Sequence, residues 1–243
     1  VSVRNGKLDI QYYISMPSWV PCKLEQHYGN IQMPSKNPAP CQLTVKYGNI
    51  EGGSFEQPLQ LEAKYSNVTL GALQSADFDL GYCGKVILES ASQLNADSKY
   101  SNLKAGEIGS LALDLKYGQL EAEKIQSVAA DVKYSSCKIG YLVDNLTAES
   151  LDYSTLELDA VNAKFQKIQV EARYSAVKLA LPSSASFRVK GENLKYGHCK
   201  LLGFEPTKSE KEKDAVYYEV NGGKNGSIYF DAGGFSNMNI RKE

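Results

Sequence analysis

The feature that most constrains the fold is a short phrase that the chain repeats. A run of alternating apolar and polar residues ends in a tyrosine, a small residue follows, and the alternation then resumes; "LALDLKYGQLEA" (Leu111–Ala122) is the clearest copy. Ten of the sixteen tyrosines share this position, with spacings of 17 to 22 residues. They are Tyr28, Tyr47, Tyr65, Tyr82, Tyr100, Tyr117, Tyr134, Tyr153, Tyr174 and Tyr196. Such regular spacing indicates an internal repeat.

Each repeat is predicted to contain two short strands joined at a corner. Leu113 and Leu115 alternate with charged residues before Tyr117, and this period of two is that of a strand. The small residue after the tyrosine is often followed by asparagine, which tolerates left-handed backbone angles, so this pair is expected to form the corner. Around Tyr82 the pattern slips by one position, which predicts one extra residue in that corner.

The repeat predicts an all-β fold, a single right-handed parallel β-solenoid (β-helix). The period excludes helices, and 17 to 22 residues are too few for the helical-pair solenoids. We expect residues 1–243 to form one domain of about eleven turns, with equivalent strands about 4.8 Å apart. A sandwich or barrel of antiparallel hairpins is the alternative. That fold would not require one tyrosine per pair of strands, always before the same corner.

The two ends depart from the regular pattern. The segment "NGKLDIQYYISMP" is expected to form a first turn, with Asn5 in the tyrosine position. Residues 205–215 are charged and aperiodic, and they are predicted to be a solvated loop excursion. Residues 216–243 are expected to cap the C-terminal end, with Phe235 in an aromatic position.

Parity assigns the tyrosines to the interior. Tyr117 alternates in phase with Leu113 and Leu115, so the rings are predicted to form a buried, stacked ladder that stabilises the parallel sheet. On this interpretation, replacing Tyr117 with alanine should cost about 3–5 kcal/mol. The alternative is an exposed aromatic column on which sugars stack.

Charged residues form two further columns. Lysine or arginine precedes most of the tyrosines, and an acidic residue lies two places earlier in the chain. We expect a self-neutralising, solvated face; a charged strip that binds anionic polymers is the alternative. The acidic column is Glu62, Asp79, Asp97, Asp114, Asp131 and Glu171, and the basic column is Lys46, Lys64, Lys99, Lys116, Lys133, Arg173 and Lys195.

Composition and motifs narrow the function classes. The formal net charge of −1 argues against nucleic-acid binding, and no apolar run approaches the roughly 18–20 residues that span a bilayer. His27 and His198 both occupy repeat positions, and no His/Cys or His/Asp cluster has metal-ligand spacing. No phosphate-binding loop or nucleophile elbow is present. We therefore expect no catalytic, cofactor-binding or metal-binding residues, no cofactor and no enzymatic activity.

Two cysteines occupy equivalent positions on adjacent turns. Cys22 and Cys41 each lie six places before a tyrosine, so their Cα atoms should lie near 5 Å apart, inside the roughly 4.4–6.8 Å window for a disulfide. Side chains in aligned parallel strands point the same way, so two packed thiols are as consistent with this spacing as a bridge. Cys137 and Cys199 should be free thiols in the core.

The succession "HYGNIQM", "KYGNIEG", "KYSNVTL", "KYSNLKA" and "KYGQLEA" resembles a bacterial family of adhesin-like β-helical proteins, related to the head domains of auto-transporter adhesins. The resemblance covers about residues 5 to 204. It implies an exported bacterial protein of the periplasm or cell surface, with a signal peptide that is not among these residues. The family contributes no catalytic residues to carry over.

Three functions are consistent with these observations. The leading hypothesis is a non-enzymatic, exported structural or adhesin-like module that presents long, regular faces to a surface polymer, a glycan or an envelope protein. The second is a glycan-binding or polysaccharide-processing β-helix, which would need exposed aromatic residues and a carboxylate cluster in a groove. The third is an accessory protein of envelope stress.

Overall fold

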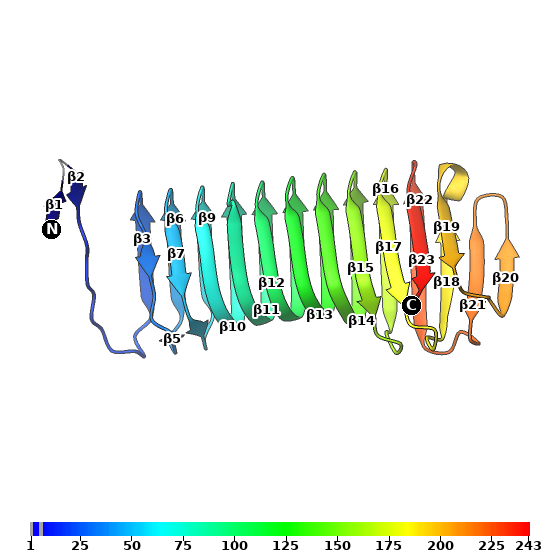
Figure 1. Ribbon diagram of the computed structural model, residues 1–243, viewed down its shortest axis with the longest axis horizontal. Coiled ribbons are helices and arrows are strands. Elements are labelled where there is room, and N and C mark those ends of the chain that lie inside the picture. Colours follow the sequence, from blue (N-terminus) through cyan, green and yellow to red (C-terminus); the bar gives the residue numbers. More distant parts are fainter. Residues whose placement is uncertain (1, 5–6) are drawn as a thin grey trace.

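The computed structural model is a β-solenoid of stacked parallel coils, and it describes residues 2–4 and 7–243 (Figure 1). The predicted fold is confirmed, but the stack has about nine turns rather than eleven. Nine corners, from Tyr28 to Tyr174, are formed in the same way. The coils beyond Tyr174 are irregular, and the turn expected around Asn5 is not part of the stack.

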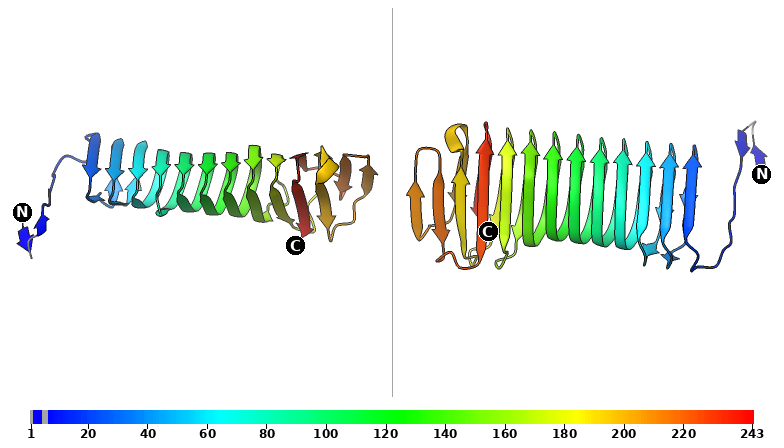
Figure 2. Two further views of the ribbon diagram at one scale, coloured as in Figure 1. Left: turned by 90° about the horizontal axis from the view of Figure 1, so that it is seen from above. Right: turned by 180° about the vertical axis from the view of Figure 1, so that it is seen from behind.

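Strand length increases from the first coils to the middle of the stack. The first coils contain β3 (Cys22–His27), β4 (Ile31–Gln32), β5 (Lys36–Asn37), β6 (Cys41–Lys46), β7 (Asn49–Gly52), β8 (Ser54–Phe55) and β9 (Leu59–Lys64). In the middle, one long strand runs from each tyrosine corner to the next, as β10 (Asn67–Gly81), β11 (Lys85–Lys99), β12 (Asn102–Lys116), β13 (Gln119–Lys133) and β14 (Ser136–Asp152). Each long strand bends once, so that a coil has two walls facing one interior (Figure 2).

Equivalent positions of successive coils pair in register. Leu113 pairs with Ala130, and Lys116 pairs with Lys133, as the repeat predicts. At the Tyr82 corner, Val68 pairs with Val86 although 18 residues separate them and the two tyrosines are 17 apart. The extra residue predicted in this corner is therefore confirmed.

The inner positions of the coils form one continuous apolar core along the stack. Leu80, Ser98 and Leu115 occupy the same inner position on three successive coils, and each is at most 1% exposed. The hydroxyl of Ser98 has no hydrogen-bond partner among the described residues. A buried hydroxyl without a partner lowers stability, because it loses the hydrogen bonds that it makes to water in the unfolded chain.

Replacing Ser98 with alanine should therefore raise the free energy of unfolding by about 1 kcal/mol, measured by chemical denaturation. Ser101 is the matched control. Its Oγ donates to the carbonyl of Lys99 (2.8 Å) and accepts from the amide of Cys83 (2.9 Å), so Ser101→Ala should lower stability by about 1–2 kcal/mol. Equal losses in the two variants would contradict this account.

The N-terminal residues do not form the expected first turn. Strands β1 (Ser2–Arg4) and β2 (Lys7–Asp9) pair antiparallel with each other, and both lie beyond the end of the stack (Figure 1, Figure 2). Asn5, predicted to occupy a tyrosine position, lies outside the described residues. Residues 10–21 connect this hairpin to β3. A coil requires its two strands in opposite walls, and hairpin pairing is incompatible with that arrangement.

The C-terminal coil lies inside the stack. Strand β22 (Gly226–Gly233) pairs with β16 (Lys167–Arg173) on one side and with β18 (Phe187–Glu192) on the other. On the opposite wall, β23 (Asn237–Lys242) lies between β17 (Ala176–Leu181) and β19 (His198–Leu202). The last coil is thus inserted between two coils that precede it in the chain, while β15 (Thr155–Val161) continues the regular stack before them.

This insertion changes which residues close the C-terminal end. A hairpin of β20 (Lys208–Lys211) and β21 (Val216–Val220) pairs antiparallel with β18 and forms the last layer on that wall. The segment 205–215, expected to be a loop, therefore supplies a strand. Of the segment 216–243, expected to be the cap, only β21 lies at the end. In the coil formed by β18 and β19, a short 3₁₀ helix, Leu194–Tyr196, replaces the regular corner.

Candidate functional site

Each regular corner is formed by the tyrosine itself, in the left-handed conformation. The nine tyrosines from Tyr28 to Tyr174 have φ between 50° and 59°. One left-handed residue interrupts the alternation of an extended strand, so a ring that parity would place inside is directed outward. Leu115 is fully buried, whereas Tyr117 is 49% exposed. The predicted buried ladder is therefore wrong in its location.

The small residue after the tyrosine faces inward and closes the corner. Ser135 shows the arrangement, since its Oγ donates to the carbonyl of Lys133 (2.7 Å) and accepts from the amide of Gly118 on the previous coil (3.0 Å). The asparagine that follows was predicted to take the left-handed angles. Instead Asn49 and Asn67 extend along the surface, and the Nδ2 of Asn67 donates to the Oδ1 of Asn49 (3.0 Å).

The tyrosines do stack as predicted. Ring centroids of neighbours from Tyr28 to Tyr174 lie 4.7–5.1 Å apart, and their planes differ by 2–10°. Phe235 of the inserted coil continues the ladder, tilted, between Tyr174 (6.2 Å) and Tyr196 (5.3 Å). Each ring face is covered by the next ring, so the ladder presents ring edges and hydroxyls to solvent. A sugar ring cannot stack face to face along it.

Beside the tyrosine ladder, the wall that precedes each corner carries the predicted basic and acidic columns. Within single coils, Lys64 pairs with Glu62 (2.9 Å), Lys99 with Asp97 (3.2 Å) and Lys116 with Asp114 (2.8 Å). The bond from Lys64 lowers the pKa of Glu62, and the same bond raises the pKa of Lys64. Both charges therefore persist over a wide pH range, and the pair is lost on acidification through the lowered carboxyl pKa.

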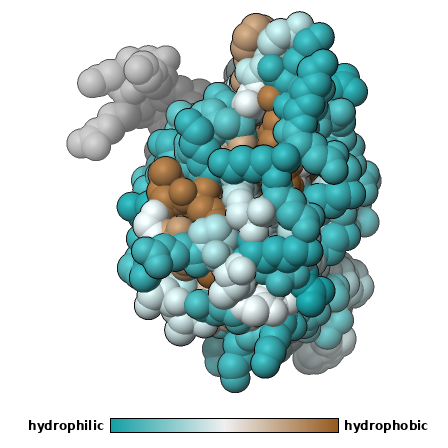
Figure 3. Space-filling model, turned by 90° about the vertical axis from the view of Figure 1, so that its right-hand side faces the viewer, coloured by the Kyte–Doolittle hydropathy of each residue, from teal (hydrophilic) through white to brown (hydrophobic). Residues whose placement is uncertain are grey.

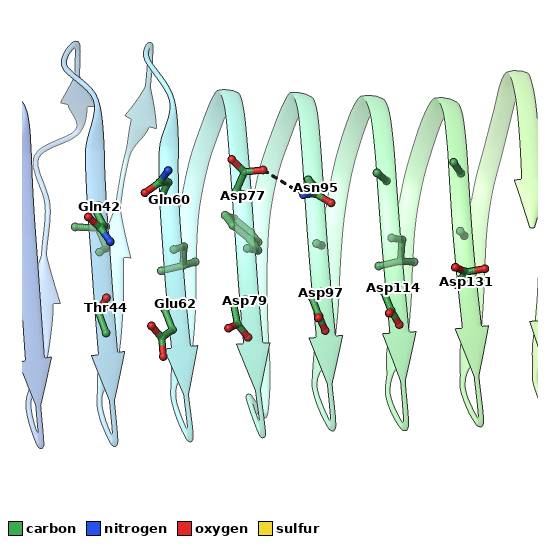
Figure 4. A pocket seen from close by; sticks show the side chains of 18 of the residues that line it. Gln42, Thr44, Gln60, Glu62, Asp77, Asp79, Asn95, Asp97, Asp114 and Asp131 are labelled. Carbon is green, nitrogen blue, oxygen red and sulfur yellow. Dashed lines mark hydrogen bonds between the residues drawn. The ribbon is translucent and has the colours of Figure 1, made fainter. Parts of the chain in front are cut away.

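The acidic column borders a groove that crosses the coils of this wall (Figure 4). The groove has a volume of about 600 Å³ and is lined by outward side chains and intervening inner positions of seven successive coils, from Gln42 to Glu149. At about 4.8 Å per coil, six steps give a length of about 29 Å. Its charged lining side chains are all acidic: Glu62, Asp77, Asp79, Asp97, Asp114, Asp131 and Glu149.

The side chains along the groove change from large to small. Gln60, Asp77 and Asn95 form one outward column, and the amide of Asn95 donates to Asp77 (3.3 Å; Figure 4). Further along, Ala112 and Ala129 occupy the same column. Alanine side chains are short, so they leave this part of the wall open beside Asp114. This second column was not recognised from the sequence as part of a site, although its members lie two places before the acidic ones.

Two carboxylates on the groove have a free hydrogen-bonding position. The Oδ2 atoms of Asp97 and Asp114 contact lysines, while their Oδ1 atoms are shielded from solvent and have no partner among the described residues. Because solvent does not reach either Oδ1 atom, a ligand in the groove cannot donate to it. The carboxylates that such a ligand can reach are the exposed ones of the lining, among them Asp77, Asp79 and Asp131.

The opposite wall has a different electrostatic character. There, positive and negative side chains alternate between coils, and Lys104 pairs with Glu121 (3.4 Å) and Lys138 with Asp159 (3.1 Å). Bridges between coils neutralise this wall along its length. The sequence prediction of self-neutralisation concerned the two columns beside the tyrosines, where Lys64–Glu62, Lys99–Asp97 and Lys116–Asp114 form such pairs. The bridges between coils on the opposite wall were not predicted.

The cysteine pair lies where the repeat places it. Cys22 and Cys41 are register partners, their Sγ atoms are 3.1 Å apart, and both are free. Burial and the contact with Cys22 raise the pKa of Cys41 to about 12. Cys137 and Cys199 are buried free thiols, as predicted, and burial raises the pKa of each to about 12.

We expect the unfolded, unreduced protein to titrate with five free thiols, because disulfide formation proceeds through a thiolate and burial suppresses ionisation of Cys41. In the native protein, alkylation should modify the half-buried Cys22 first and leave Cys137 and Cys199 unmodified. A count of three free thiols would instead establish a Cys22–Cys41 bridge.

Other kinds of site were sought across the described residues. Within them, no group of three or more His, Cys, Asp or Glu side chains could hold a metal ion. The described part of the chain also contains no helix with the length and apolarity needed to cross a bilayer. His27 contacts Glu25 (3.1 Å) and His198 contacts Asn239 (3.2 Å), so each histidine has a polar neighbour on the surface.

No family model, curated protein or solved structure matches the chain. The candidate site is therefore defined by its geometry alone, as the groove with its acidic lining and the tyrosine ladder at its side.

Proposed function

We propose that the protein is a non-enzymatic, adhesin-like module that binds an extended glycan along the groove. The observation that carries this proposal is the lining, in which seven successive coils present equivalent polar positions and the charged side chains are all acidic. A polymer whose hydroxyl or amino groups recur along its length could meet the same carboxylate position on each coil. The exposed carboxylates of Asp77, Asp79 and Asp131 supply acceptors for those donors.

The groove supplies the carboxylates that a polysaccharide-processing enzyme would also need, but the aromatic residue in its lining, Phe78, is buried. General acid catalysis requires a carboxyl group whose pKa is raised towards neutrality. Glu62 has the opposite shift, because Lys64 stabilises its ionised form. The lowered pKa of Glu62 therefore favours binding over catalysis at this carboxylate.

The site can be tested with Asp79→Asn/Asp131→Asn, which keeps side-chain shape but removes two exposed charged acceptors of the groove. The matched control is Glu121→Gln/Glu157→Gln on the opposite wall. We expect the wild type to bind extended neutral or amine-bearing polysaccharides on an array, the groove variant to lose at least about tenfold in affinity, and the control to be unchanged. Equal binding by all three proteins would contradict the groove as the site, and turnover lost on changing one carboxylate would establish the enzyme instead.

The proposed location is the bacterial cell envelope, either periplasm or surface. The resemblance of the tyrosine phrases to the exported adhesin-like family supports this proposal, and a long, regular solenoid is consistent with a surface scaffold. A role as an accessory protein of envelope stress would place the chain in the same compartment. Gene neighbourhood separates these two roles, since stress components beside the gene would favour the accessory role.

A further inference from the structure

The two ends of the solenoid differ in a way that bears on assembly. At the C-terminal end, the final strand β20 is exposed throughout and carries Lys208, Glu210 and Lys211. Hydrophilic side chains dominate this end of the molecule (Figure 3). Charged edge strands resist pairing with other chains. The hairpin β20–β21 also covers one wall only, because it pairs with β18 and not with β19.

The N-terminal end is open. Among the strands that the structure describes, β3 pairs with β6 and with no other. Its inner residues Cys22 and Leu24 are half-buried, whereas their register partners Cys41 and Leu43 on the next coil are at most 7% exposed. A further layer of strand would bury these two side chains to the same degree.

The backbone of β3 also has unused hydrogen-bonding groups. The amides of Cys22 and Tyr28 donate to carbonyls of the second coil. Peptide groups of a strand alternate between its two edges, so the groups of Lys23 and Glu25 face the open edge. Their side chains point to solvent on the outer wall.

From these features we propose that the N-terminal end binds a second copy of this chain, head to head, with the two β3 strands antiparallel about a two-fold axis at Leu24. In this register Lys23 of each copy faces Glu25 of the other, and the peptide groups of these residues face one another as hydrogen-bonded pairs. Leu24 packs against Leu24 of the second copy. The strand is thus complementary to itself in backbone, charge and apolar contact.

The arm before β3 extends this interface. Residues 10–20 project beyond the open end (Figure 1, Figure 2), and they expose large apolar side chains, with Tyr12 at 81%, Tyr13 at 90% and Trp19 at 76%. Exposed apolar side chains that are adjacent in this way mark an interaction surface. A stable dimer buries roughly 1,200–2,000 Å² in total, which is more than two strand edges supply. The arms lie where they would cover the second copy.

Such a dimer is closed. A two-fold interface uses the same patch on both copies, so each molecule has one such site and no filament grows. The charged C-terminal hairpin remains at both outer ends of the assembly, and the two grooves continue on either side of the junction.

Sedimentation equilibrium of the full chain tests the proposal. We expect a dimer for the wild type, and dissociation constants at least about tenfold higher for Lys23→Glu and for Glu25→Lys, because each places like charges opposite one another twice. The double variant Lys23→Glu/Glu25→Lys restores both pairs and should recover the dimer. Lys211→Glu at the other end is the control and should leave association unchanged.

Each contrary result has a definite meaning. A wild type that stays monomeric at about 100 μM would overturn the proposal, and slow amide exchange of β3 in that monomer would identify the chain's own N-terminal residues as the occupant. A dimer weakened by Lys211→Glu but not by the β3 variants would place the interface at the C-terminal end. Failure of the double variant to recover association would refute the antiparallel register. Circular dichroism confirms that each variant is folded.

Discussion

Replacing Phe230 with alanine should lower the free energy of unfolding of the C-terminal end by about 3–5 kcal/mol, the range for a fully buried phenylalanine. Phe230 belongs to the inserted coil and is the register partner of both Val170 and Gly191. Its side chain therefore packs at the junction of three coils. A cavity here should weaken the insertion on both of its sides together.

Denaturation monitored by hydrogen exchange measures this effect and locates it. In a stacked repeat protein each coil contacts its neighbours, so exchange should accelerate in residues 187–242 and remain slow in β11 to β13. Tyr229→Phe is the control, since it removes one surface hydrogen bond, from the Tyr229 hydroxyl to Glu192 (2.7 Å), and should cost about 1 kcal/mol or less. A Phe230→Ala loss no larger than that of the control would contradict the packing of the inserted coil.

Leu115 and Tyr117 should differ in their contribution to stability, although parity would place both in the interior. Leu115→Ala should cost about 2–5 kcal/mol, because the side chain is fully buried in the central core. Tyr117→Ala should cost about 1–3 kcal/mol, from two stacking contacts with Tyr100 and Tyr134 at about 0.5–1.5 kcal/mol each. Urea denaturation of the two variants gives the comparison.

A third variant separates stacking from backbone conformation. Tyr117 has φ of 55°, which disfavours residues other than glycine by roughly 1–2 kcal/mol. Tyr117→Gly loses the same ring contacts but relieves this strain, so it should be more stable than Tyr117→Ala. If Tyr117→Ala instead proved as costly as Leu115→Ala, the rings would have to contribute as buried side chains do.

The fold could be predicted because its information is local and repeated. Alternation around Leu113 and Leu115 indicates strands, and the tyrosine spacing sets the register in which coils pair. The location of the rings could not be derived in this way. Alternation identifies a face only while every residue is extended, and one left-handed residue at Tyr117 reverses the assignment.

Neither the groove nor the C-terminal insertion could be predicted from the sequence, and the reasons differ. Asp97 and Asp114 were recognised as members of a column, but the hollow beside them depends on how the wall is shaped by Ala112 and Ala129. Phe235 was recognised in an aromatic position, yet its neighbours Tyr174 and Tyr196 are set by which strand edges are free in space. The repeated sequence pattern around each tyrosine does not determine with which strands the last coil pairs.

The insertion has a consequence for the order in which the molecule can be completed. A ribosome releases the coil of residues 187–202 before residues 226–242, although the latter lie between that coil and the regular stack. The regular turns can pair one after another as the chain emerges, whereas the coil of residues 187–202 has no neighbouring strand on the side of the stack until residues 226–242 have been synthesised. Docking of this coil therefore follows synthesis of the later segment, and a chain truncated before residue 226 should keep its first turns while residues 187–202 lack ordered structure.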